Sequence, residues 1–202
     1  MAAKVFIIES SYPVDYYSRQ LDGIATRSLL DVLQLENRIR MVLDKEHFQK
    51  GLDEASANGY RILHLSCHGD EDGIALANNY QPTWDEFADF FQNIDHCPTV
   101  LVMSACAGAC KGIADAFRSR TKRPAIIFGS VDERTYAEYA TAWAILYHCF
   151  KKRGINTVAA QTALKQISVV VSSKFRYRRW SAKPSSYRVF PGANTKFEIK
   201  MV

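Results

Sequence analysis

The 202-residue sequence lacks several signatures of common functional classes. It contains neither a Gly-x-Gly-x-x-Gly sequence nor a P-loop sequence, which excludes the two usual glycine-rich phosphate-binding loops. It has no internal repeat and no low-complexity segment. No apolar run is long enough to cross a bilayer, and the run near the start is too short for a secretory signal. We therefore expect a cytoplasmic protein without membrane contacts.

The sequence has few cysteines, and their number is odd. The five cysteines are Cys67, Cys97, Cys106, Cys110 and Cys149. An odd count argues against a complete disulfide framework, and cytoplasmic thiols stay reduced. At least one of these residues is therefore available for thiol chemistry.

Charge of neither sign dominates. The net charge is +5, and charged residues make up 23% of the chain against 48% hydrophobic residues, as in ordinary globular domains. Basic residues concentrate in 118–123, 151–153 and 174–188. Solvated faces explain such clusters more simply than an acidic partner such as nucleic acid, which stays the less favoured alternative.

Apolar runs alternate with amphipathic segments along the chain. The predicted strands are Lys4–Glu9, Arg38–Leu43, Tyr60–Cys67, Thr99–Ser104 and Pro124–Phe128. The predicted helices are Tyr16–Leu35, Lys45–Asn58, a segment capped by Thr83 with Glu86, Lys111–Arg120, Arg134–Lys152 and Thr157–Val171. This alternation predicts an α/β fold with a mainly parallel central sheet and helices on both faces.

The sequence after Ser172 changes character and becomes rich in Lys, Arg, Tyr and Ser. We expect one domain over 1–172 and a basic, aromatic extension over 173–202. The extension forms edge strands at Tyr187–Phe190 and Lys196–Met201 or a partly mobile arm. Basic and aromatic residues interleave in Lys174–Trp180, a pattern that can bind nucleic acid. Packing of the aromatic rings at a sheet edge is the favoured interpretation.

Two apolar runs end at reactive residues. The run from Ile62 ends in His68-Gly69, and the run from Val100 ends in Ala105-Cys106. Parallel strands end at the same edge of a sheet, so neighbouring strands would bring an imidazole and a thiol together there. A histidine can activate a cysteine nucleophile, and the N–H groups of Gly69 and Cys106 could hold an oxyanion. Burial as inert core residues is the alternative for both side chains.

Other ligand sets are weaker. His64, Cys67, His68 and Cys106 could bind zinc only if strand geometry did not spread them over both faces of the sheet. We expect His64 and Cys67 to serve packing. The sequence therefore predicts neither a metal nor an organic cofactor.

The sequence His64-Leu-Ser-Cys-His-Gly69, followed by Leu101-Val-Met-Ser-Ala-Cys-Ala-Gly108 and Gly112-Ile-Ala-Asp-Ala-Phe117, resembles the CHAT branch of the caspase-like (clan CD) cysteine peptidases. The stretch from Ala125 to Val131-Asp132-Glu133 resembles the family's strand that ends in a Val-x-Asp signature. The helix around Ala159–Leu164 is similar to the closing helix of that family. The resemblance spans roughly residues 5–171. It implies a three-layer caspase-like domain with His68 as general base and Cys106 as nucleophile.

The resemblance also implies a substrate class and a setting. Related separases bind the substrate arginine through an acid at the position of Asp132 or Glu133, which implies cleavage after Arg or Lys. Capping of the helix near Arg134 is the alternative role for both acids. Asp70, Glu71 and Asp72 form a competing acidic run, most simply a solvated loop.

Relatives act on partner proteins, which implies a protein substrate, a separate activator or regulatory partner and a role in bacterial antiviral defence or cell death. Two other functions stay open: an inactive caspase-like scaffold, and a flavodoxin-like binding module in which the thiol is incidental.

Overall fold

A computed structural model describes residues 4–172 and 174–192 of the chain. Its centre is an eight-stranded sheet in the order β2-β1-β3-β5-β6-β7-β8, with β4 paired to β3. The parallel strands are β1 (Lys4–Ser10), β2 (Glu36–Met41), β3 (Ile62–Gly69), β5 (Val100–Ser104) and β6 (Ile126–Ser130). The antiparallel additions are β4 (Ile74–Ala75), β7 (Phe175–Ser181) and β8 (Ser186–Phe190). The prediction of a mainly parallel sheet is confirmed.

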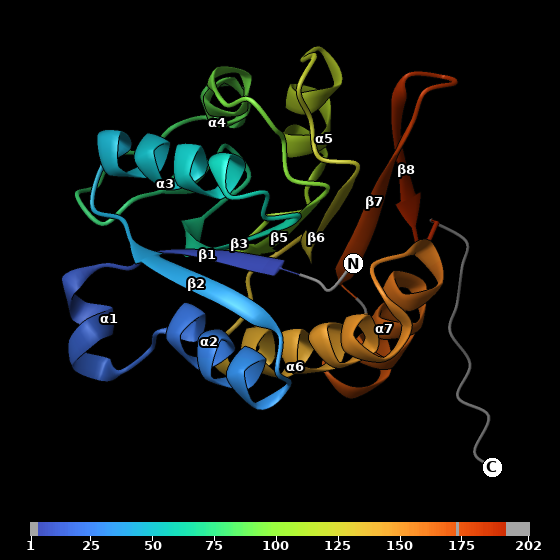
Figure 1. Cartoon of the computed structure of the whole chain (residues 1–202), viewed down its shortest axis with the longest axis horizontal. Coiled ribbons are helices and arrows are strands. Elements are labelled where there is room, and N and C mark those ends of the chain that lie inside the picture. Colours follow the sequence, from blue (N-terminus) through green and yellow to red (C-terminus); the bar gives the residue numbers. More distant parts are fainter. Residues whose placement is uncertain (1–3, 173, 193–202) are drawn as a thin grey trace.

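Helices cover both faces of the sheet (Figure 1). One face carries α2 (Asp22–Val32), α6 (Tyr136–Arg153) and α7 (Thr157–Val170). The other carries α3 (Lys45–Ala57), α4 (Trp84–Phe90) and α5 (Lys111–Arg118), with the 3₁₀ turn Phe91–Asn93. The short α1 (Pro13–Ser18) directly follows β1. The fold therefore has three layers, as the sequence predicts.

Strand periodicity explains the two cores. Along β3, Leu63 and Leu65 pack toward α3 and α4, while Ile62 packs toward α6 and α7. Successive side chains of a strand point to opposite faces, and both faces of this sheet are covered. The central parts of β1, β3 and β5 are therefore apolar runs without Asp, Glu, Lys or Arg, and the two charged residues of β1, Lys4 and Glu9, lie near its ends.

The single helix predicted over Tyr16–Leu35 is wrong. The segment forms two helices, because Arg19 adopts the left-handed conformation (φ 58°) and ends α1 before α2 begins at Asp22. Pro13 at the first turn fixes the start of α1. Apolar spacing alone did not reveal this break, which places Asp15 on a separate short helix.

The later helix boundaries depend on capping residues. Thr83 caps α4 through a reciprocal capping box with Glu86, as predicted. Thr135 and Glu138 form the same arrangement at the start of α6. Capping of this helix by Asp132 or Glu133, the alternative weighed for these acids, is therefore wrong.

The segment after α7 continues the sheet. The stretch interpreted as basic and aromatic is strand β7, whose Phe175 and Tyr177 are buried in the core beneath α6 and α7. The packing interpretation of this stretch is thus confirmed, although β8 and not β7 is the edge. The strand predicted at Tyr187–Phe190 forms as β8, and the one predicted at Lys196–Met201 lies outside the described residues.

Candidate active site

His68 lies at the carboxyl end of β3, next to the end of β5. Its ring stacks on Tyr12 with centroids 4.5 Å apart and an interplanar angle of 15°. The ring of Tyr136 stands edge-on to it at 6.3 Å. The imidazole side chain is 37% exposed, so it is oriented by its neighbours and still reachable from solvent.

Asp15 holds the imidazole from the side of α1. Its Oδ2 lies 2.8 Å from Nε2 of His68 and accepts a hydrogen bond of the same length from the N–H of Tyr12. The hydroxyl of Tyr136 lies 3.2 Å from the same Nε2. A carboxylate at Nε2 fixes the proton on that nitrogen and leaves Nδ1 as the basic atom.

Asp15 was missed by sequence reasoning. The signal for it was present, because Asp15 follows the carboxyl end of β1 by five residues, and His68 and Cys106 also lie at carboxyl ends of strands. Asp15 lies one residue before the predicted helix Tyr16–Leu35 and was assigned no role from the sequence.

Cys106 lies in a tight loop after β5. The loop includes Ala107 with a positive φ of 54°. Three hydrogen bonds join the loop to other segments. The hydroxyl of Tyr139 donates to the carbonyl of Ala105 (2.6 Å), the N–H of Ala109 donates to Ser130 (2.8 Å), and Nε of Arg178 donates to Ala109 (2.7 Å). These bonds hold the thiol at the sheet edge.

The imidazole and the thiol line one cavity of about 100 Å³. Its lining residues are Cys67, His68, Ser104, Cys106, Arg134, Tyr136 and Tyr139. The structure therefore brings together the two residues that the sequence singled out. Cys67 also packs against the core under α3 and α4, and burial raises the pKa of its thiol well above the usual value.

Gly69 brings the two strand ends into backbone contact. A Cβ added at Gly69 would lie 3.0 Å from the carbonyl oxygen of Cys106 and 3.0 Å from that of Gly73. Within the described part of the chain, the N–H of Cys106 has no backbone acceptor. A residue with a side chain at position 69 would separate the two loops.

The two acids expected to bind a substrate arginine differ in their surroundings. Asp132 accepts two hydrogen bonds from Arg134, at 2.9 and 2.6 Å, and one from Ser130. Partial burial works against ionisation of Asp132, but the bonds from Arg134 and Ser130 outweigh it and lower its pKa. Glu133 is exposed, and neither Asp132 nor Glu133 lines the cavity of His68 and Cys106. Arg134 stands between Asp132 and Cys106, which sequence reasoning did not foresee.

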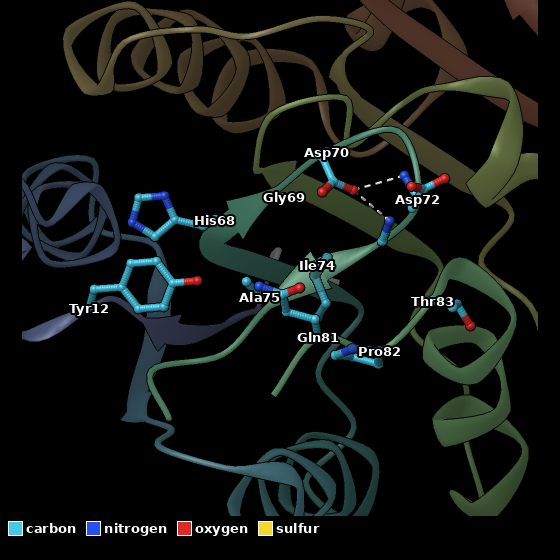
Figure 2. Close-up of a pocket in the computed structure, with 11 residues that line it drawn as sticks. Tyr12, His68, Gly69, Asp70, Asp72, Ile74, Ala75, Gln81, Pro82 and Thr83 are labelled. Carbon is cyan, nitrogen blue, oxygen red and sulfur yellow. Dashed lines mark hydrogen bonds between the residues drawn. The ribbon is translucent and has the colours of Figure 1, made fainter. Parts of the chain in front are cut away.

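A second, polar cavity of about 250 Å³ is also lined by His68 (Figure 2). Its wall includes Tyr12, Gln81 and Thr83, and Asp70 accepts hydrogen bonds from the N–H groups of Asp72 and Gly73. The acidic run after His68 is thus a folded turn beside the imidazole.

Buried acids lie beneath the site. Ser104 donates a hydrogen bond to Asp22 and Ser11 donates one to Glu9, while the Ser66 hydroxyl lies within hydrogen-bond distance of both carboxyl groups. Burial, followed by the charge of Asp22, raises the pKa of Glu9 to about 7. His64 is fully buried beside this network and bonds to Tyr147 at 2.9 Å, which agrees with its predicted packing role.

Neither a metal centre nor a membrane span is found in the described residues. No group of three or more His, Cys, Asp or Glu side chains among residues 4–172 and 174–192 could hold a metal ion. None of the helices in the same ranges is long and apolar enough to cross a bilayer. All five cysteines are free thiols.

Solved structures share this architecture. A secreted C11 cysteine protease of Bacteroides thetaiotaomicron, "iotapain", matches 88% of the chain with a TM-score of 0.57 and 11% identity. The complex of the RgpB pro- and mature domains of Porphyromonas gingivalis matches 85% with a TM-score of 0.56 and 14% identity. The Arg specific cysteine proteinase gingipain R (RGPB) matches 82% with a TM-score of 0.53 and 12% identity.

The chain has the caspase-like cysteine protease fold. It spans 66% of the C11 protease chain and 44% and 42% of the two RgpB chains. No family model and no curated protein sequence matches it. At these identities the similarity defines the fold, and the chemistry must be argued from the residues of the site.

Proposed function

We propose that the chain is a cysteine endopeptidase with Cys106 as nucleophile and His68 as general base. The observation that supports this most is the shared cavity of the thiol and the imidazole at the sheet edge. A free thiol is mostly protonated at neutral pH and needs a base to become a nucleophile. Asp15 supplies the orienting carboxylate that makes the far nitrogen of His68 available as that base.

The reaction follows from these positions. His68 takes the Cys106 proton, and the sulfur adds to the carbonyl carbon of the substrate while the N–H of Cys106 and that of Gly69 stabilise the oxyanion. The imidazolium then gives its proton to the leaving amine, and the C–N bond breaks to leave a thioester. Water activated by His68 hydrolyses the thioester, which releases the acid and restores the thiol.

We propose cleavage after Arg, with Lys as a weaker substrate. Gingipain R is described as Arg specific, and in this chain Asp132 binds a guanidinium through two hydrogen bonds. That geometry suits guanidinium better than ammonium. A protein substrate, a separate activating partner, a cytoplasmic location and a role in bacterial antiviral defence or cell death stay predictions.

A peptide acyloxymethyl ketone ending in Arg tests the proposed chemistry. We expect stoichiometric labelling of Cys106, mapped by mass spectrometry, and loss of labelling in Cys106→Ala and His68→Ala. Cys110→Ala removes a nearby thiol outside the cavity and should label like the natural chain. Labelling that survives His68→Ala would contradict the proposed role of the imidazole.

Absence of labelling in both the folded natural chain and a folded Arg134→Gln variant would favour an inactive scaffold.

A further inference from the structure

The segment between β6 and α6 closes the cavity at Cys106. The carbonyl oxygen of Arg134 accepts a weak hydrogen bond from the Cys106 thiol at 3.9 Å. The carbonyl of Asp132 accepts one from the N–H of Ala107 at 3.2 Å. The segment 131–135 is therefore attached to the cysteine loop at both of these points, and its Arg134 carbonyl contacts the partly exposed sulfur.

The Arg134 side chain is held by two carboxylates. Its Nε and Nη2 donate to the two oxygens of Asp132, and its Nη1 donates to Glu138 at 3.0 Å. The guanidinium side chain is 19% exposed. Hydrogen bonding to Asp132 raises the pKa of Arg134 further above its already high value. Two parallel bonds to one carboxylate are the strongest arrangement available to a guanidinium.

We infer that Arg134 occupies the site as the arginine of a bound substrate would, so that the structure is a self-blocked state which an arginine-containing peptide or an activating partner must open. This inference rests on the proposed function. One residue places its guanidinium on the recognition carboxylate and its carbonyl at the nucleophile. Both contacts are the ones that a substrate residue before the cleaved bond would make.

Two features protect the Arg134–Thr135 bond from cleavage. The sulfur faces the carbonyl oxygen as a hydrogen-bond donor, whereas attack requires approach to the carbonyl carbon. The amide nitrogen that would leave belongs to Thr135, whose N–H is bound by Glu138 at 2.9 Å as the cap of α6. The leaving group is thus anchored to an 18-residue helix and cannot depart.

The size of the cavity agrees with a blocked site. Its volume of about 100 Å³ falls below the roughly 300–1,000 Å³ of typical ligand pockets. Both oxygens of the Asp132 carboxylate already accept hydrogen bonds from Arg134, so a substrate guanidinium would have to displace Arg134 to form the same paired bonds. Displacement of Arg134 would enlarge the cavity and uncover the thiol in a single movement.

The alternative is a structural pair that merely shapes the turn before α6. The substitution Arg134→Gln separates the two. A matched control is Arg120→Gln, because Arg120 is 21% exposed and binds two carboxylates, Asp85 and Asp89, at a place outside this cavity. Circular dichroism and the melting temperature of each variant report whether it folds.

The first measurement is the rate of Cys106 alkylation by iodoacetamide, followed by peptide mapping. A self-blocked site predicts an increase of at least about tenfold in Arg134→Gln, the cost of removing one charged hydrogen-bonded pair, and no change in Arg120→Gln. A rate within twofold of the natural chain in folded Arg134→Gln overturns the inference. If Arg134→Gln does not fold, Arg134→Lys, which keeps the charge but not the paired bonds, is expected to give a smaller increase.

The second measurement, hydrolysis of an Arg peptide, keeps the two proposals distinguishable. Faster alkylation with no hydrolysis supports the blocked site and contradicts the peptidase. Full hydrolysis by the natural chain with no gain in Arg134→Gln supports the peptidase and contradicts the blocked site. Gains in both rates support both proposals.

Discussion

The Asp15 carboxylate lies 2.8 Å from Nε2 of His68, although 53 positions separate the two residues in the chain. Asp15 is 5% exposed. Tyr12, the N-cap residue of the same short helix, stacks its ring on the imidazole. The segment after the first strand of the sheet therefore also contributes a side chain to the site. Under the proposed function, Asp15 adds a third member to the pair of His68 and Cys106.

Substitution of Asp15 by Asn should lower the rate of hydrolysis by about 10- to 100-fold, because a hydrogen bond to a charged group contributes about 1.5–3 kcal/mol. The loss should fall on kcat and leave KM nearly unchanged, since Asp15 acts through His68. Asp31→Asn is the control, because Asp31 is an exposed acid of α2 whose carboxylate accepts a hydrogen bond from Asn37, away from the cavity. An unchanged kcat in Asp15→Asn would remove the carboxylate from the mechanism.

Gly69→Ala should abolish peptide hydrolysis or reduce it at least about 100-fold while the protein stays folded. The added methyl group would sit 3.0 Å from the backbone oxygens of Cys106 and Gly73, where the surroundings cannot retreat as a flexible side chain would. Steady-state kinetics with the melting temperature check this. Gly59→Asn is the control, since nothing lies within 4 Å of its added Cβ and asparagine tolerates its φ of 67°. Full activity of Gly69→Ala would show that the two loops need not touch.

The stability of the protein should fall between about pH 5 and pH 8 because of Glu9. Burial and the neighbouring Asp22 raise its pKa from 4.5 to about 7, so the folded state binds more protons than the unfolded state in this window. The contribution of Glu9 to the free energy of unfolding is present in full below its pKa in the unfolded state. It is lost as the pH rises through the pKa in the folded state, which lowers the free energy of unfolding by about 2–3 kcal/mol.

Urea unfolding at pH 5 and pH 8 measures this difference. Glu9→Gln should remove most of it, because the amide stays neutral throughout the range. Glu36→Gln, at an exposed acid of β2 that pairs with Lys4, should leave the difference as it is. Equal pH dependence in Glu9→Gln and the natural chain would contradict the assignment to Glu9.

Much of the architecture was readable from local patterns. Central strands such as β3 and β5 are apolar on both faces because helices cover both, and such runs stand out in a sequence. Thr83 and Glu86 marked the start of α4 correctly because a capping box is a local interaction. Strand β7 was not listed among the predicted strands, because Arg and aromatic residues alternate along it. In the structure Phe175 and Tyr177 pack in the core, while Arg176 lies on the opposite face of the strand. Such a pattern also fits a nucleic-acid-binding segment.

The sequence by itself determined which residues could do thiol chemistry and that two of them follow buried strands. It also determined the layers of the fold, because burial of apolar runs is a local property of composition and spacing. Only the tertiary structure decided that Asp15 contacts His68, that Gly69 approaches the Cys106 loop and that the Arg134 carbonyl contacts the sulfur. These are contacts between distant segments, and their geometry depends on strand order and loop conformation, which no local pattern encodes.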